Sequence, residues 1–116
     1  MRTALFCSAV DVADAGPSAV LDDALERAGV DGLAVAASYH AARDLLPHAR
    51  GARLRAFPAG LWIARDPAVW DGCPVPPARA GDDATEAAVR ELVAAAAARG
   101  ASVDGPGSAA STCMKT

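Results

Sequence analysis

Two short apolar segments, TALFCSAV at residues 3–10 and LAVAAS at residues 33–38, decide the fold class of this chain. Each is a nearly continuous apolar run, which is typical of a strand that is buried on both faces. Residues 17–28 lie between them and place apolar side chains on one helical face, with a proline in the first turn and Gly29 after the last turn. A strand, a helix and a strand in this order form a βαβ unit, whose two strands are parallel. The sequence therefore predicts the α/β fold class.

The middle of the chain predicts a short helix followed by a β-hairpin. Residues 39–46 precede Pro47, and a helix ends before proline because the residue preceding it avoids the α conformation. Residues 53–57 (RLRAF) and 61–65 (LWIAR) flank the turn sequence Pro-Ala-Gly, and a three-residue connection with glycine is typical of a hairpin. The prolines within residues 66–81 predict a loop.

A long amphipathic helix is predicted after this loop. Asp83 and Glu86 have the spacing of a capping box at its start, and Gly100 ends it. Glu86 and Arg90 have the i, i+4 spacing of an ion pair on its surface. Its apolar stripe consists of Val89, Leu92, Val93 and Ala96. Residues 101–104 then begin another strand.

Residues 105–116 (GPGSAASTCMKT) differ in character from the rest of the chain. They combine Gly, Pro and Ser without any hydrophobic periodicity, a composition typical of disorder. We therefore expect an incomplete α/β domain over residues 1–104 and a disordered tail over residues 105–116. The abrupt change after about residue 104 further predicts a truncated or frameshifted reading frame.

Composition and cysteine spacing exclude several classes of function. The net charge is −3 and the basic residues are scattered, so no nucleic-acid surface is predicted. No apolar stretch approaches the ~20 residues of a membrane-spanning helix, so no membrane partner is predicted either. Cys7, Cys73 and Cys113 are too widely spaced for a zinc or thioredoxin-type motif. The N-terminal apolar run is short and has acidic neighbours, which favours a buried strand over a signal peptide and predicts a cytoplasmic protein with reduced thiols.

Polar side chains follow both strands of the predicted βαβ unit. Asp11 follows the first strand, and the second strand ends in Ser38, Tyr39 and His40. Because parallel α/β folds bind ligands at the carboxyl ends of their strands, we expect Tyr39, His40 and Asp11 to form a substrate-binding site. In it Tyr39 stacks on the ligand, His40 serves as acid, base or hydrogen-bond donor, and Asp11 accepts hydrogen bonds. The alternative is that Ser38 and His40 cap the next helix and Asp11 is a solvated turn residue.

A metal site and a cofactor site are both disfavoured. His40, Asp44 and His48 have an i, i+4, i+8 spacing, which would place three metal ligands on one face of a continuous helix. Pro47 interrupts that helix before His48, so no metal site is predicted, and metal binding through His40 and His48 is the weakest hypothesis. The sequence contains neither a glycine-rich phosphate loop nor a nucleophile elbow, so it predicts no cofactor and identifies no catalytic residue.

Residues 31–48, DGLAVAASYHAARDLLPH, resemble the opening of a family of bacterial glycoside-hydrolase-like (β/α)8-barrel proteins. The residues that carry the likeness are Ser38, Tyr39, His40, Arg43, Pro47 and His48. The likeness extends over about residues 2–103, through the short hairpin and the helix that ends in Ala-Arg-Gly. The resemblance implies the first third of a barrel, in which Tyr39 and His40 bind a carbohydrate substrate.

The expected fold is therefore a partial (β/α) barrel-like unit, built from a βαβ unit, a short helix, a β-hairpin and a long helix. The resemblance places the acids of a hydrolase on later strands of the barrel. We therefore expect a carbohydrate-binding fragment that is not catalytically complete and is not an enzyme by itself. The alternative is a small self-contained α/β binding or interaction module that self-associates through open sheet edges.

Overall fold

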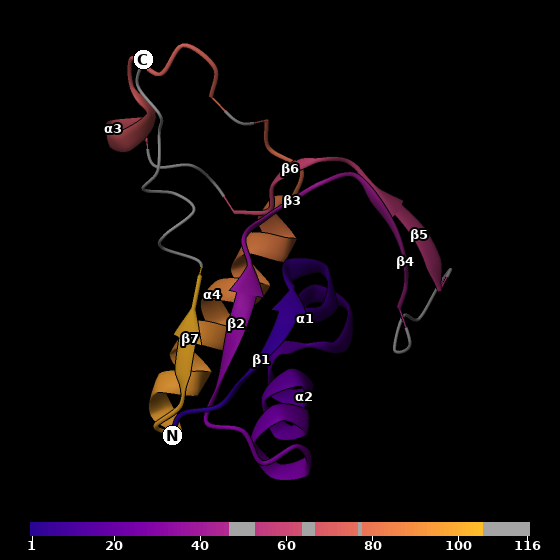
Figure 1. Cartoon of the computed structure of the whole chain (residues 1–116), viewed down its shortest axis with the longest axis vertical. Helices are drawn as coiled ribbons and strands as arrows, with labels where there is room; N and C mark the ends of the chain where they lie inside the picture. The colour runs from indigo at the N-terminus through magenta and orange to yellow at the C-terminus, as the bar shows by residue number, and fades with distance from the viewer. Residues whose placement is uncertain (47–52, 64–66, 77, 106–116) are drawn as a thin grey trace.

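A three-stranded parallel sheet forms the centre of the protein. The computed structural model describes residues 1–46, 53–63, 67–76 and 78–105. The sheet has the order β1 (Ala4–Ser8), β2 (Gly32–Ala36) and β7 (Ser102–Asp104), so the strands follow one another in space as they do along the chain (Figure 1). The central strand pairs in parallel with both neighbours. The predicted α/β fold class, the two strands of the βαβ unit and the strand at residues 101–104 are thus confirmed.

A helix that the sequence analysis missed begins directly after β1. The strand ends at Ser8 and not at residue 10, because Ser8 caps helix α1 (Ala9–Ala15). The Asp11 backbone N–H donates to Ser8 Oγ at 3.1 Å, and the Ser8 backbone N–H donates to Asp11 Oδ2 at 3.4 Å, which together form a capping box. Gly16, at φ +92°, then separates α1 from the next helix.

The predicted helix over residues 17–28 is confirmed. Helix α2 (Pro17–Asp22) continues into the π-helical turn η1 (Asp23–Arg27). Leu21 and Ala24 are buried on its inner side, as the apolar periodicity predicts. Gly29 follows at φ +69°, the left-handed conformation that glycine adopts most readily at a helix end.

The residue that caps helix α4 (Asp83–Ala98) lies one position earlier in the chain than predicted. The side chain of Asp82 is the cap, and its Oδ1 accepts a hydrogen bond from the Thr85 backbone N–H at 2.8 Å. Asp83 is therefore the first helical residue and does not form a capping box with Glu86. Asp83 and Glu86 both lie in the first turn of the helix, where their negative charges interact favourably with the positive end of the helix dipole.

The stripe of α4 packs against the other helices and the sheet. Val89, Leu92 and Ala96 are buried, whereas Val93 is 41% exposed and lies outside the packed stripe. The predicted surface ion pair is present, with Arg90 Nη2 2.8 Å from Glu86 Oε1. The buried core around this stripe includes Ala9, Val12, Leu21, Ala24, Leu33 and Val35.

Acid is expected to weaken the Asp82 cap. Hydrogen bonding from Thr85 holds the pKa of Asp82 below its usual value. The cap therefore contributes its full stability above the unfolded carboxyl pKa of about 4 and loses it as the pH falls through the lower folded value. In thermal melts by circular dichroism, Asp82→Ala should lower Tm at pH 7, and the gap to the wild type should close in acid. Asp82→Asn keeps a capping oxygen, so its Tm should vary less with pH; a constant gap for Asp82→Ala would contradict this account.

Two short strands, β3 (Ser38–Tyr39) and β4 (Ala42–Leu45), replace the helix predicted over residues 39–46. Strand β3 pairs antiparallel with β6 (Gly60–Leu61), and β4 pairs antiparallel with β5 (Leu54–Phe57). The β4–β5 ribbon extends away from the central sheet (Figure 1). The helix prediction is wrong because cross-strand pairing outweighs the weak local preference of this segment for a helical turn.

The predicted hairpin between residues 53–57 and 61–65 is also wrong. Strand β5 pairs with β4, so its partner precedes it in the chain instead of following it. The chain after β5 turns back toward the central sheet, where the Trp62 backbone N–H donates to the Ala37 carbonyl at 2.8 Å. The Trp62 ring also packs edge-on against Phe57, with ring centroids 5.6 Å apart. Residues 64 and 65 lie outside the described residues.

The segment predicted as a loop contains a short helix, α3 (Pro67–Trp70). Cys73 is disulfide-bonded, which corrects the expectation that all thiols are reduced, whereas Cys7 is a free thiol. Residues 106–116 of the tail predicted over residues 105–116, including Cys113, lie outside the described residues. Within the described ranges, no helix is both long and apolar enough to cross a membrane.

Candidate functional site

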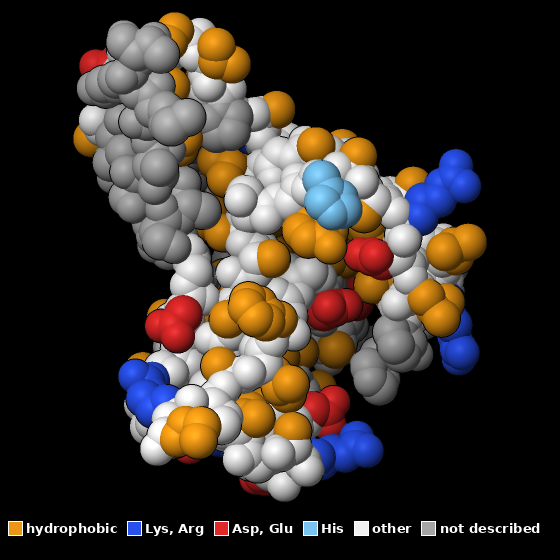
Figure 2. Space-filling model, viewed as in Figure 1, with side chains coloured by type: hydrophobic (Ala, Val, Ile, Leu, Met, Phe, Trp, Pro, Cys, Tyr) orange, Lys and Arg blue, Asp and Glu red, His pale blue; other side chains and the backbone are white. Residues whose placement is uncertain are grey.

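Among the described residues, the helices cover one face of the central sheet and leave the opposite face open. Helix α4 lies behind β2 and β7, and α1 and α2 lie beside β1 (Figure 1). Side chains alternate between the two faces of a strand, so the buried Leu33 points toward the helices and its neighbour Ala34 points away from them. In the register of the sheet, Ala34 lies between Phe6 and Asp104. Phe6 is 90% exposed, and Figure 2 shows hydrophobic side chains on this face with acidic ones among them.

Tyr39 and His40 form an exposed ring pair beyond the carboxyl end of β2. Their ring centroids are 4.2 Å apart with an interplanar angle of 30°, and Tyr39 is 47% exposed. His40 Nδ1 lies 2.9 Å from the carbonyl oxygen of Ala41, to which its N–H donates. In the neutral ring this leaves Nε2 as an acceptor for a ligand. Because no helix follows here, the alternative that Ser38 and His40 cap one is wrong.

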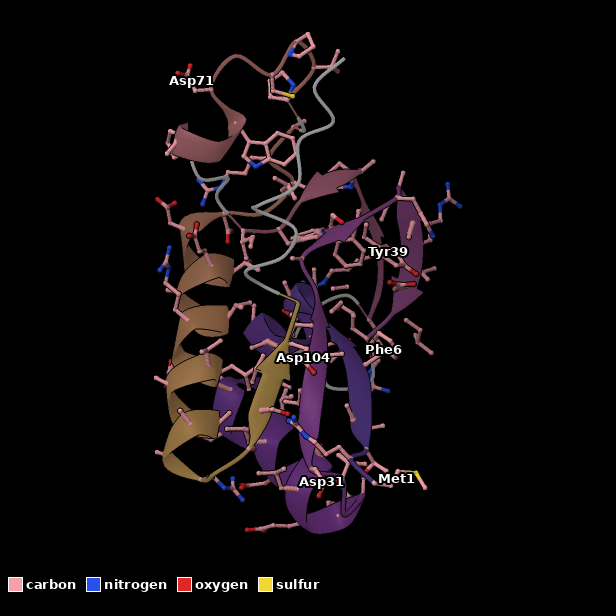
Figure 3. All side chains as sticks on the ribbon, turned by 60° about the vertical axis from the view of Figure 1, so that its left-hand side comes forward. Met1, Phe6, Asp31, Tyr39, Asp71 and Asp104 are labelled. Carbon is pink, nitrogen blue, oxygen red and sulfur yellow. The ribbon has the colours of Figure 1, made fainter. Side chains whose placement is uncertain are left out.

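Asp11 lies at the same end of the sheet but faces a different surface. It follows β1 as Tyr39 follows β2, and the two strands are parallel, so the topology brings both residues to one edge. Asp11 lines a cavity of about 260 Å³ beside β1, and neither Tyr39 nor His40 lines this cavity. Asp11 lies in helix α1, which Ser8 caps, so Asp11 is not a solvated turn residue. The substrate-binding role of Asp11, Tyr39 and His40 stays a prediction. In Figure 3, Tyr39 and Phe6 both lie on the side of the strands that is opposite to α4.

The cavity also contains residues that the sequence analysis did not identify. Asp14 and Asp23 line it together with Cys7 and Leu46. Asp14 Oδ1 accepts from Arg55 Nη1 at 3.2 Å, whereas Asp14 Oδ2 is buried and has no hydrogen-bond partner in the described part of the chain. The i, i+3 spacing of Asp11 and Asp14 would have indicated a shared helical face if helix α1 had been predicted.

The cavity suppresses the reactivity of the Cys7 thiol. Burial, and then the negative charge of Asp11, raise the pKa of Cys7 to about 11. The thiolate is the nucleophile. At pH 8 the alkylation rate of Cys7 should therefore be at least about tenfold lower in the folded chain than in the same chain in denaturant. Mass spectrometry of the peptide that contains Cys7 measures both rates. Asp11→Asn should speed the reaction of the folded chain, and equal rates with and without denaturant would contradict the buried position.

No metal site is present among the described residues, since no three His, Cys, Asp or Glu side chains are grouped to hold an ion. His40 follows β3 and Asp44 lies in β4, so the continuous helix that would have aligned them does not form. His48 lies outside the described residues, and the metal hypothesis for it stays untested.

Comparison of the chain with protein-family models, with curated proteins and with solved structures finds no match. No family assignment follows, and the resemblance of residues 31–48 to a barrel family stays a prediction. The features that indicate a function are therefore the ring pair, the open face of the sheet and the cavity beside β1.

Proposed function

We propose that this chain is a barrel-type α/β unit that binds carbohydrate and performs no hydrolysis by itself. The observation that carries this proposal is the exposed Tyr39–His40 ring pair beyond the carboxyl end of β2. Ligand sites of parallel α/β folds lie at this end of the strands. The proposal includes a partial barrel fold and the resemblance to glycoside-hydrolase-like proteins.

The order of the sheet supports the barrel-type assignment. Within the sheet, the strands β1, β2 and β7 lie side by side in the same order in which they occur along the chain. When parallel strands are added in one direction with right-handed connections, every connecting helix lies on the same face, as in a (β/α)8 barrel. The helices α1, α2 and α4 contact one another, which agrees with a single helical layer. A doubly wound sheet would instead carry helices on both faces.

The ring pair has the chemistry of a sugar platform. The apolar face of a pyranose can stack on the exposed Tyr39 ring, whose hydroxyl group can both donate and accept a hydrogen bond. Nε2 of neutral His40 can accept a hydrogen bond from a sugar hydroxyl group. The platform is open to solvent, so we expect weak binding that depends on several sugar units side by side.

Removing the Tyr39 ring should weaken carbohydrate binding about tenfold or more, since one aromatic contact is worth roughly 1–3 kcal/mol by analogy with base stacking. The probes are soluble gluco-, xylo- and chito-oligosaccharides titrated into the 15N-labelled chain, with dissociation constants taken from amide shifts at Tyr39 and His40. Phe6→Ala is the matched control, because it removes an exposed aromatic ring outside the pair. If no oligosaccharide shifts these amides at tens of millimolar, carbohydrate binding by this site is excluded.

The alternative function is a non-enzymatic interaction module. The specific observation in its favour is Phe6, a large apolar side chain that is 90% exposed on an edge strand of the sheet. Exposed apolar surface next to an unpaired strand edge is characteristic of a protein-binding site.

A further inference from the structure

The outer edge of β1 carries backbone groups that no other strand pairs within the described part of the chain. Strand β1 hydrogen-bonds to β2 along one edge only, from the pair Ala4–Gly32 to the pair Ser8–Ala36. Proteins protect free edges with charged residues or proline, and the sequence ALFCS of β1 contains neither. The edge is therefore a template for an additional extended segment.

The cavity beside β1 reaches around this edge. It is lined by Leu5, Phe6 and Cys7, which are consecutive residues of β1. Consecutive side chains of a strand point to opposite faces, so a cavity that touches all three follows the edge itself. Leu46, at the end of the β4–β5 ribbon, closes the cavity with a further apolar contact. An occupant of the cavity would thus lie alongside the free backbone groups of β1.

The cavity offers carboxylate oxygens that the protein does not fully satisfy. Asp14 Oδ2 is buried without a hydrogen-bond partner among the described residues, although Oδ1 of the same carboxylate is paired with Arg55. A donor that enters the cavity can therefore bond this oxygen, which offsets the cost of burying an unpaired acceptor. Asp11 adds a second carboxylate to the lining, and its Oδ2 accepts a long hydrogen bond of 3.4 Å from the Ser8 backbone N–H. Asp23 adds a third, paired with Arg27 at 3.1 Å.

We propose that this edge binds an extended peptide segment of a partner protein, which pairs its backbone with β1 and places a Lys or Arg side chain against Asp14. The apolar walls accommodate the aliphatic part of that side chain and its apolar neighbours. A second copy of β1 fits the site poorly, because each copy would bring the carboxylates of its own cavity to the shared edge. The proposal is independent of carbohydrate binding, since Tyr39 and His40 lie outside this cavity.

The test uses the full 15N-labelled chain and three short, blocked peptides of alternating valine and threonine that differ only in a central lysine, glutamine or glutamate. The lysine peptide should shift the amide signals of β1 and of Asp14, and it should bind about tenfold more tightly than the glutamate peptide. Asp14→Asn should reduce this preference to a few-fold. Asp71→Asn removes the same charge at the far end of the molecule, near α3, and should leave the preference unchanged (Figure 3).

Three results would overturn the proposal. The first is equal affinity of the wild-type chain for the lysine and glutamate peptides, which does not depend on how any variant folds. The second is a set of peptide-induced shifts confined to β7, the other edge strand. The third is a peptide-free dimer in size-exclusion chromatography whose β1 amides are protected from hydrogen exchange, because the occupant would then be a second copy. Carbohydrate binding is reported by Tyr39 and His40, so failure of one proposal is distinguishable from failure of the other.

Discussion

Leu92→Ala is expected to lower the free energy of unfolding by about 2–5 kcal/mol, the range for truncating a fully buried leucine. Leu92 is fully buried on the stripe of α4, which packs on α1 and α2. The cost should lie in the upper part of that range because the neighbouring core is rich in alanine, whose short side chains cannot move to fill the cavity. Since small domains are stable by only about 5–15 kcal/mol, this variant should lose a large part of its stability. Urea unfolding followed by far-UV circular dichroism measures the loss.

Val93→Ala provides the matched control on the same helix. Val93 is adjacent in sequence but 41% exposed, so its truncation should change the free energy of unfolding by less than about 1 kcal/mol. Comparable losses for the two variants would show that α4 does not pack through the stripe of Val89, Leu92 and Ala96.

Gly32→Ala is expected to destabilise the protein by roughly 1–3 kcal/mol, the usual cost of overpacking a close contact. A Cβ atom at position 32 would lie 2.5 Å from the carbonyl oxygen of Ser102 and would also clash with the Ser102 side chain. The backbone of β7 is the obstacle, so the strand has to move away from β2. This variant should therefore weaken the attachment of β7 more than it weakens the helical layer.

Hydrogen exchange of the β7 amides distinguishes this effect from a general loss of stability. In Gly32→Ala these amides should exchange faster than the amides of α4, whereas a uniform loss of protection would contradict the local clash. Gly100→Ala serves as the comparison, because Gly100 has a φ of +72° and open space around its Cβ position. Its cost of about 1 kcal/mol should come from backbone strain alone and leave the β2–β7 pairing intact.

The parts of the fold that the sequence predicted correctly are those with a local signature. The apolar runs of β1 and β2, the proline before α2 and the stripe of α4 each act within a few residues. Helix α1 was missed although Ser8 and Asp11 have the spacing of a capping box, because the apolar run was extended through residues 9 and 10. An apolar run cannot by itself distinguish the end of a strand from the start of a buried helix.

For the candidate sites, the sequence predicted only the end of the sheet at which their residues lie. Parallel pairing of β1 and β2 brings Asp11 and Tyr39 to the same end of the sheet, as expected. Whether they share a cavity depends on how β3, β4 and Leu46 fold over that end, and the helix predicted for this segment was wrong. The contribution of Asp14 was not predictable, because its partner Arg55 is distant in sequence and reaches it only through the β4–β5 ribbon.

The sequence by itself determined the α/β class, the parallel βαβ unit and the long helix, because hydrophobic periodicity and Gly and Pro positions act through local geometry. The tertiary structure alone decided which strand β5 pairs with, which face of the sheet the described helices leave open and where the carboxylates gather. Strand partners and burial depend on contacts between residues far apart in the chain, and the free energy of such contacts is not encoded in any one segment. With 31 alanines among 116 residues, few large side chains mark the core in advance, so packing rather than pattern determined which surfaces remained exposed.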